Sequence, residues 1–112
     1  MSNKFYGTGN LGTNPELKQL EDGVVCNMRV YFDRPVPVDD GFEDKGGFWL
    51  NVDAWDKLAQ ACNDNLSKGT RVTIEGTLIG HEWINDDGAK QASINLRAKR
   101  ISMDITVLKN QQ

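Results

Sequence analysis

Alternating apolar and polar residues predict two half-buried β-strands in the first half of the chain. In 24–32 one side is apolar, with Cys26, Met28, Val30 and Phe32, and the other carries Val25, Asn27, Arg29 and Tyr31. In 48–55 Leu50, Val52 and Ala54 point one way, and Trp49, Asn51, Asp53 and Trp55 point the other. A period of two is typical of a strand with one face on the core.

After residue 55 the period changes to that of a helix. Apolar side chains recur at Trp55, Leu58, Ala59, Cys62 and Leu66, which predicts a helix over 56–66. We expect Asp56 to be its N-cap and Gly69 to follow its end.

A long hairpin is predicted in the second half, with strands over 71–84 and 90–101 and a turn at 85–88. We expect Val72, Ile74, Leu78, Ile94, Leu96 and Ala98 to face inward, and Asn95, Arg97 and Lys99 to face outward. Gly76 and Gly80 suggest bends or bulges. Residues 4–11 form a shorter first strand, 34–47 read as a long mobile loop, and 103–108 close the chain.

These elements predict a mainly β protein. Three strands, one helix and a long hairpin fit a five-stranded Greek-key barrel of the OB type, with the helix between strands three and four. At 112 residues we expect one domain over 1–108 and a short C-terminal end at 109–112.

Composition is that of an ordinary soluble protein, with 38% hydrophobic and 26% charged residues. The net charge of −3 argues against a nucleic-acid partner, but the charges are unevenly distributed, so a local basic surface is still possible. Acidic residues gather at 33–44, whereas Lys90, Arg97, Lys99, Arg100 and Lys109 dominate from residue 88 onward. We expect a cytoplasmic, nucleoid-associated protein, since the sequence shows neither a signal peptide nor a membrane span.

Catalytic, metal and cofactor chemistry find little support. Residues 7–12 match G-x-G-x-x-G, but the next element is another strand, whereas a dinucleotide site needs a helix. His81 is the one histidine, and it has no evident nucleophile partner. Cys26 and Cys62 fall on apolar faces and are expected to be buried thiols.

The aromatic residues outside the predicted core are the strongest functional signal. Trp49, Trp55 and Tyr31 lie on non-core faces, and Trp83 lies near the end of the long hairpin. Such rings can form a second core or a subunit interface. Alternatively, they can stack on unpaired bases while nearby lysines and arginines neutralise phosphates.

Several blocks resemble bacterial single-stranded-DNA-binding proteins. Residues 9–12 (GNLG) with 15–18 (PELK) resemble the opening of that family, and 49–59 resemble its W-x-x-V-x-x-[FW]-x-K-L-A passage. Residues 66–76 resemble its L-x-KG-x-x-V-x-[VI]-EG stretch, and 83–88 its W-x-x-x-x-G hairpin. The likeness spans about residues 3–108 and implies an OB fold, sequence-independent binding of single-stranded DNA and a homo-oligomer, as a tetramer or a dimer.

The resemblance implies stacking by Trp49, Trp55 and Trp83 and phosphate contacts by Lys18, Lys57 and Lys68. Strand parity adds Tyr31 as a stacking residue, and Arg29, Arg71, Arg97 and Lys99 as phosphate contacts. Two alternatives stay open: a replication-restart or primosome-type OB adaptor, and an OB module whose tryptophans face a protein.

The chain also departs from the family. Val36 stands near a usual stacking tryptophan, His81 and Glu82 replace basic residues, and Asp53 adds an acid to the binding face. We therefore expect weaker binding over a smaller site. The sequence ends at 109–112 without the family's linker and acidic tip, which suggests a shortened chain or a natural short member, as from a phage or plasmid. Recruitment of replication or repair enzymes thus stays open.

Overall fold

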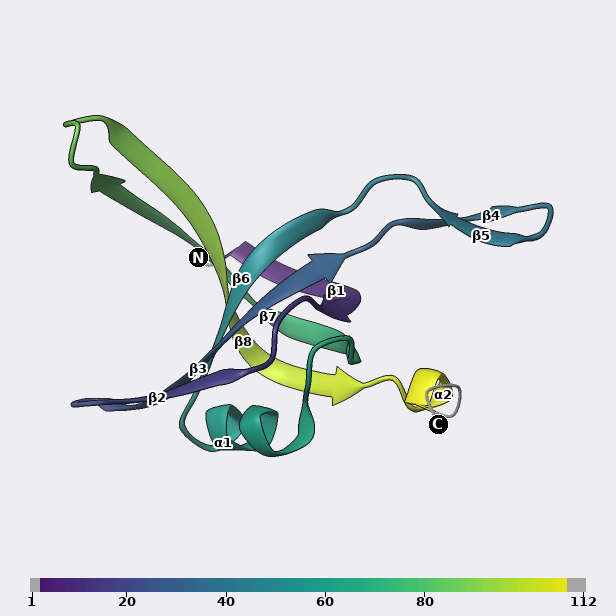
Figure 1. Cartoon of the computed structure of the whole chain (residues 1–112), viewed down its shortest axis with the longest axis horizontal. Helices are drawn as coiled ribbons and strands as arrows, with labels where there is room; N and C mark the ends of the chain where they lie inside the picture. The colour runs from purple at the N-terminus through teal and green to yellow at the C-terminus, as the bar shows by residue number, and fades with distance from the viewer. Residues whose placement is uncertain (1–2, 109–112) are drawn as a thin grey trace.

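Five long strands close into a barrel in the computed structural model, which describes residues 3–108 (Figure 1). They are β1 (Asn3–Leu11), β3 (Gly23–Phe32), β6 (Phe48–Trp55), β7 (Arg71–Ile84) and β8 (Lys90–Met103). The strand order is β1-β7-β8-β6-β3, and β3 pairs back onto β1, so the sheet returns to its first strand. Among the strand pairs of residues 3–108, only β6 and β8 run parallel. The predicted five-stranded Greek-key barrel is confirmed.

The barrel interior holds the residues that alternation placed there. The core residues that are 0% exposed include Cys26, Val30, Val52, Ile74 and Leu96. The helix α1 (Asp56–Asn65) adds Ala59 and Cys62 to the same core. Both cysteines are therefore buried thiols, as predicted. The helix α1 lies between β6 and β7 in the chain, and it packs beside β3 and β6 at the lower end of the barrel in Figure 1.

Glycines allow the close backbone approaches that close the barrel. A Cβ on Gly9 would lie 2.2 Å from the carbonyl oxygen of Tyr31, where β1 meets β3. A Cβ on Gly76 would lie 2.2 Å from the carbonyl oxygen of Arg97, beside a register shift between Glu75 and Gly76. The predicted irregularity is thus confirmed at Gly76, whereas the pairing runs without a shift through Gly80. The G-x-G-x-x-G segment shapes a strand and its exit.

Two hairpins leave the barrel on opposite sides of Figure 1. One is the outer half of β7 and β8, with exposed Ile84 and Ile94. Ile94 was predicted to face the core, and this is wrong: it has the inward parity of Leu96, but the barrel ends before it. The other is a ribbon of β4 (Pro35–Val38) and β5 (Gly41–Asp44), where the sequence predicted a loop.

Three further local differences concern short-range structure. The strand β2 (Glu16–Leu20) pairs with the start of β3, where no strand was predicted. Trp55, not Asp56, is the N-cap residue of α1, and its side chain makes no capping bond. Asp56 is the first helical residue and has a positive φ of 54°. Its carboxylate accepts a long hydrogen bond from the Val24 N–H at 3.4 Å instead. After β8 the chain forms a single turn, α2 (Ile105–Leu108). The predicted end at 109–112 lies outside the described residues.

Candidate nucleic-acid interface

The outer face of β3 and β6 presents two tryptophans, each covered by an arginine. Trp49 is 47% exposed, and the Arg29 guanidinium lies 5.3 Å from its ring centroid. Trp55 is half-buried, and the Arg97 guanidinium lies 5.7 Å from its ring centroid. Both distances fall within the range of a cation–π contact. This face therefore combines flat rings with fixed positive charge.

Neighbouring groups hold Trp49 in place. Its ring lies against Gly12, where a Cβ would meet the indole at 2.4 Å, and Tyr31 packs beside it with ring centroids 5.2 Å apart. The Tyr31 hydroxyl donates to Asp44 at 2.8 Å and accepts from the Gly47 N–H at 3.0 Å. The hydrogen bond to Asp44 raises the pKa of Tyr31, and backbone N–H donors with that hydroxyl lower the pKa of Asp44. The ribbon thus fixes Tyr31, which in turn supports Trp49.

Between the two tryptophans lies a polar hollow of about 390 Å³. Its lining includes the predicted site residues Lys18 and Arg29 together with polar side chains that were not assigned a role, namely Asn27, Asn51, Asp53 and Asn95. Asn27 donates to Asp53 at 2.6 Å, and Arg29 donates to Asn51 at 2.9 Å. Strand alternation had put all four on the outer face, so the signal was present in the sequence.

The remaining predicted lysines and Trp83 lie around or beyond this hollow. Lys68 is exposed, and its backbone N–H donates to Asn14, which lines the hollow, at 2.8 Å. Lys57 is exposed in the first turn of α1. Trp83 is 43% exposed on the outer half of the β7–β8 hairpin, where its ring stacks on that of His81 with centroids 5.3 Å apart. Lys99 lines a different hollow with Lys4 and Tyr6.

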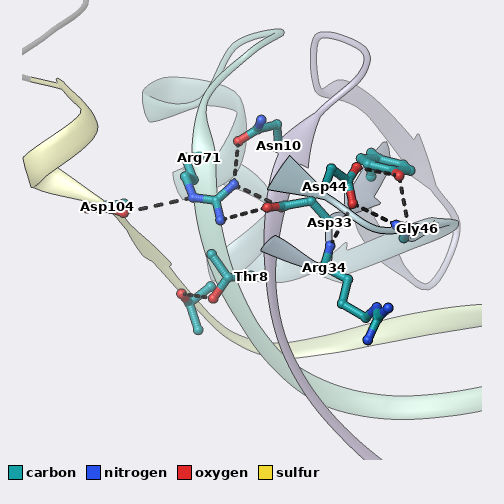
Figure 2. Close-up of polar contacts among 11 residues, drawn as sticks. Thr8, Asn10, Asp33, Arg34, Asp44, Gly46, Arg71 and Asp104 are labelled. Carbon is teal, nitrogen blue, oxygen red and sulfur yellow. Dashed lines mark hydrogen bonds and ion pairs between the residues drawn. The ribbon is translucent and has the colours of Figure 1, made fainter. Parts of the chain in front are cut away.

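Arg71 is engaged within the fold (Figure 2). Its guanidinium donates to both carboxylate oxygens of Asp33, at 2.9 and 3.2 Å, and to Asn10 at 3.2 Å. Asp104 lies 4.0 Å from its Nε. Only 21% of the Arg71 side chain is exposed. Arg71 therefore forms an ion pair within the fold, although the strand register places it in the same outward row as Trp49, Tyr31 and Asn10.

Metal and membrane features are not found in the part of the chain that is described. Among residues 3–108 no group of three His, Cys, Asp or Glu side chains is placed to hold a metal ion. No described helix is both long and apolar enough to cross a membrane.

Comparison with known proteins identifies the family. Residues 2–104 match the single-strand binding protein family. The chain belongs to that family. A relative from Chlorobaculum tepidum, "Single-stranded DNA-binding protein 2", is 30% identical over 88% of this chain and 68% of its own length. "Single-stranded DNA-binding protein 1" from Xylella fastidiosa is 27% identical over 90% of this chain and 76% of its own.

A solved structure supports the fold. The crystal structure of a small single-stranded DNA-binding protein from Streptomyces coelicolor superposes with a TM-score of 0.84, at 20% sequence identity, over 96% of this chain and 98% of that one. The family resemblance inferred from sequence blocks is thereby confirmed, and so is the OB fold. The chain spans 64% of a third relative, from Wolinella succinogenes.

Proposed function

We propose that this protein binds single-stranded DNA without catalysis, by stacking bases on Trp49, Trp55 and Trp83 and by neutralising phosphates. The observation that carries the proposal is the outer face of β3 and β6, where Trp49 and Trp55 each lie under an arginine. A base that stacks on either ring brings its phosphates close to a guanidinium. Stacking tolerates any base, because every base has a π-face.

The proposed phosphate contacts fall into two groups. Arg29, Arg97 and Lys18 lie at the tryptophans or the hollow. Lys68 is exposed and bonded through its backbone to Asn14 of the hollow, and Lys57 is exposed on the first turn of α1. Tyr31 supports Trp49 and presents part of its ring beside it. Lys99 belongs to a separate surface, which an extended strand would reach only after leaving the hollow.

The biological setting is proposed from family membership. We infer that the protein coats or protects single strands during replication, recombination or repair, in the cytoplasm and with the nucleoid. We also infer that it self-assembles, as a tetramer or a dimer. The interaction-module alternative predicts that the tryptophans meet a protein surface instead of bases, whereas the adaptor alternative keeps DNA binding.

A fluorescence titration with oligo-dT tests the proposal. We expect oligo-dT to quench tryptophan emission, duplex DNA to compete poorly, and added salt to weaken binding, with a log–log slope of about −0.7 per phosphate contacted. Trp49→Ala should weaken binding by about 5-fold to 100-fold, since one stacked base contributes roughly 1–3 kcal/mol.

The matched control is Phe42→Ala, which removes another exposed ring. Phe42 is 75% exposed on β5, in an acidic surrounding that does not suit a polyanion. We expect its affinity to stay within 2-fold of the unsubstituted protein. Absence of both quenching and a gel shift at micromolar protein would contradict the proposed function and favour an interaction module. A far-UV spectrum of Trp49→Ala that has lost its β signal would instead make Trp49 a core residue.

A further inference from the structure

The hollow lies on the path between the two stacking tryptophans. Trp49, Asn51, Asp53 and Trp55 alternate along the outer face of β6. The two tryptophans are six positions apart, which corresponds to about 20 Å at 3.3 Å per residue. A strand that stacks on both rings therefore passes over Asn51 and Asp53. Something in the DNA must face these two side chains.

The charge at the centre of the hollow disfavours phosphate. The Asp53 carboxylate accepts one hydrogen bond from Asn27, and within residues 3–108 it forms no ion pair. Arg97 pairs with Asp53 in the strand register, but its guanidinium lies over Trp55. Arg29 is likewise directed to Trp49 and Asn51. A phosphate directly above Asp53 would meet a like charge that forms no ion pair within the described residues, so a base fits at this point, and the phosphates are left to Arg29 and Lys18, which line the same hollow.

Besides Asp53, the lining of the hollow includes an acceptor on Asn95 that has no donor within residues 3–108. The Oδ1 atom of Asn95 is buried and has no hydrogen-bond partner among the described residues. A buried acceptor without a donor is destabilising, so a ligand N–H group that reached this atom would offset the cost. Asn95 lies opposite Asn51 in the β6–β8 pairing and lines the same hollow as Asp53. Asp53 and Asn95 thus each contribute an acceptor oxygen to this part of the surface.

We propose that this hollow is a base-edge subsite that takes the Watson–Crick edge of an unpaired base and prefers guanine. This inference rests on the proposed function. Guanine presents two adjacent donors on that edge, N1–H and the 2-amino group, which match the two oxygens of the Asp53 carboxylate. Thymine presents one N–H between two carbonyl oxygens, which a carboxylate repels. The protein then binds any single strand through stacking and has a base preference where the strand crosses Asp53.

Base preference is measured with equal-length oligonucleotides of simple repeat. We compare dT20 with (dG-dT)10, (dI-dT)10 and (dC-dT)10 by fluorescence competition, in lithium buffer to avoid guanine quadruplexes. The alternating repeats place the test base at every second position, so strand register does not dilute the effect. We expect (dG-dT)10 to bind about 10-fold more tightly than dT20, because a good bidentate contact discriminates by that order. Hypoxanthine lacks the 2-amino group, so (dI-dT)10 should lie between them.

The variant Asp53→Asn separates base recognition from charge. It should bind dT20 more tightly, since a like charge is removed, but bind (dG-dT)10 no more tightly than dT20. Asp22→Asn is the matched control, because it removes the same charge from the exposed β2–β3 turn. We expect it to keep the guanine preference.

Two results would overturn the subsite. One is equal affinity of the unsubstituted protein for all four oligonucleotides. The other is an Asp53→Asn variant that retains the preference, with circular dichroism reporting its fold. If that variant does not fold, the comparison of guanine with hypoxanthine in the unsubstituted protein still decides. Failure of dT20 to bind at all would instead contradict the proposed function.

Discussion

Replacing Arg71 by methionine should destabilise the fold and leave DNA affinity unchanged. Arg71 and Asp33 form a two-bond ion pair whose side chains are 21% and 18% exposed. Fully buried pairs cost about 3–5 kcal/mol to break, and exposed pairs contribute about 0–1 kcal/mol. At about one-fifth exposure we expect a loss of about 2 kcal/mol. The variant leaves the Asp33 carboxylate half-buried without its partner, and Asn10 loses its donor.

Thermal unfolding followed by circular dichroism measures this loss. For a domain of this size about 1 kcal/mol corresponds to roughly 4 °C, so Tm should fall by about 8 °C. Protein concentration must be held constant, because self-association also raises Tm. The double variant Arg71→Met with Asp33→Leu should recover part of the loss, since the Asp33 carboxylate is then no longer left without its partner.

The affinity for oligo-dT distinguishes a structural role of Arg71 from a direct contact with DNA. At a temperature well below Tm, the oligo-dT affinity of Arg71→Met should stay within 2-fold of the unsubstituted protein. A variant with unchanged Tm and an affinity reduced 10-fold would refute the reasoning and return Arg71 to the phosphate contacts.

Two further predictions concern titratable groups. Burial raises the pKa of Cys62 to about 12 and also raises that of Cys26, so native protein should react with Ellman's reagent at neutral pH far more slowly than protein in guanidinium; prompt modification of a thiol would contradict this. Hydrogen bonds lower the pKa of Asp44 below its unfolded value, so its stabilising effect is present above about pH 4 and is lost as pH falls through the folded pKa. The Tm difference between the unsubstituted protein and Asp44→Asn should therefore shrink below pH 4, and a difference independent of pH would count against the Tyr31–Asp44 contact.

Alternation predicted the barrel because it reflects burial directly. Val30, Val52 and Ile74 were placed on inward faces by parity alone, and each is fully buried. Parity does not say where a barrel ends, which is why Ile94 was misplaced on a strand that continues into solvent. The ribbon at 35–44 also escaped prediction, because two four-residue strands with prolines and acids have no apolar face to repeat.

The strand face that carries the aromatic residues could be predicted from the sequence, whereas the contacts between polar side chains could not. Trp49 and Trp55 could be assigned to one face because a single strand carries both. Strand parity placed Arg71 on an outward face but contained no information on its contact with Asp33, which lies 38 residues away in the sequence. Asn95 faces Asn51 only through the parallel pairing of β6 with β8, which requires the three-dimensional register.

The closure of the barrel has a consequence for how the protein is made. The first strand, β1, takes its main partner from β7, whose residues follow it by more than sixty positions. During synthesis β1 therefore leaves the ribosome long before β7 is made, and its edge stays unpaired until most of the chain has been translated. We expect nascent chains released before residue 84 to be open and prone to aggregation, so that the ordered domain forms only late in translation.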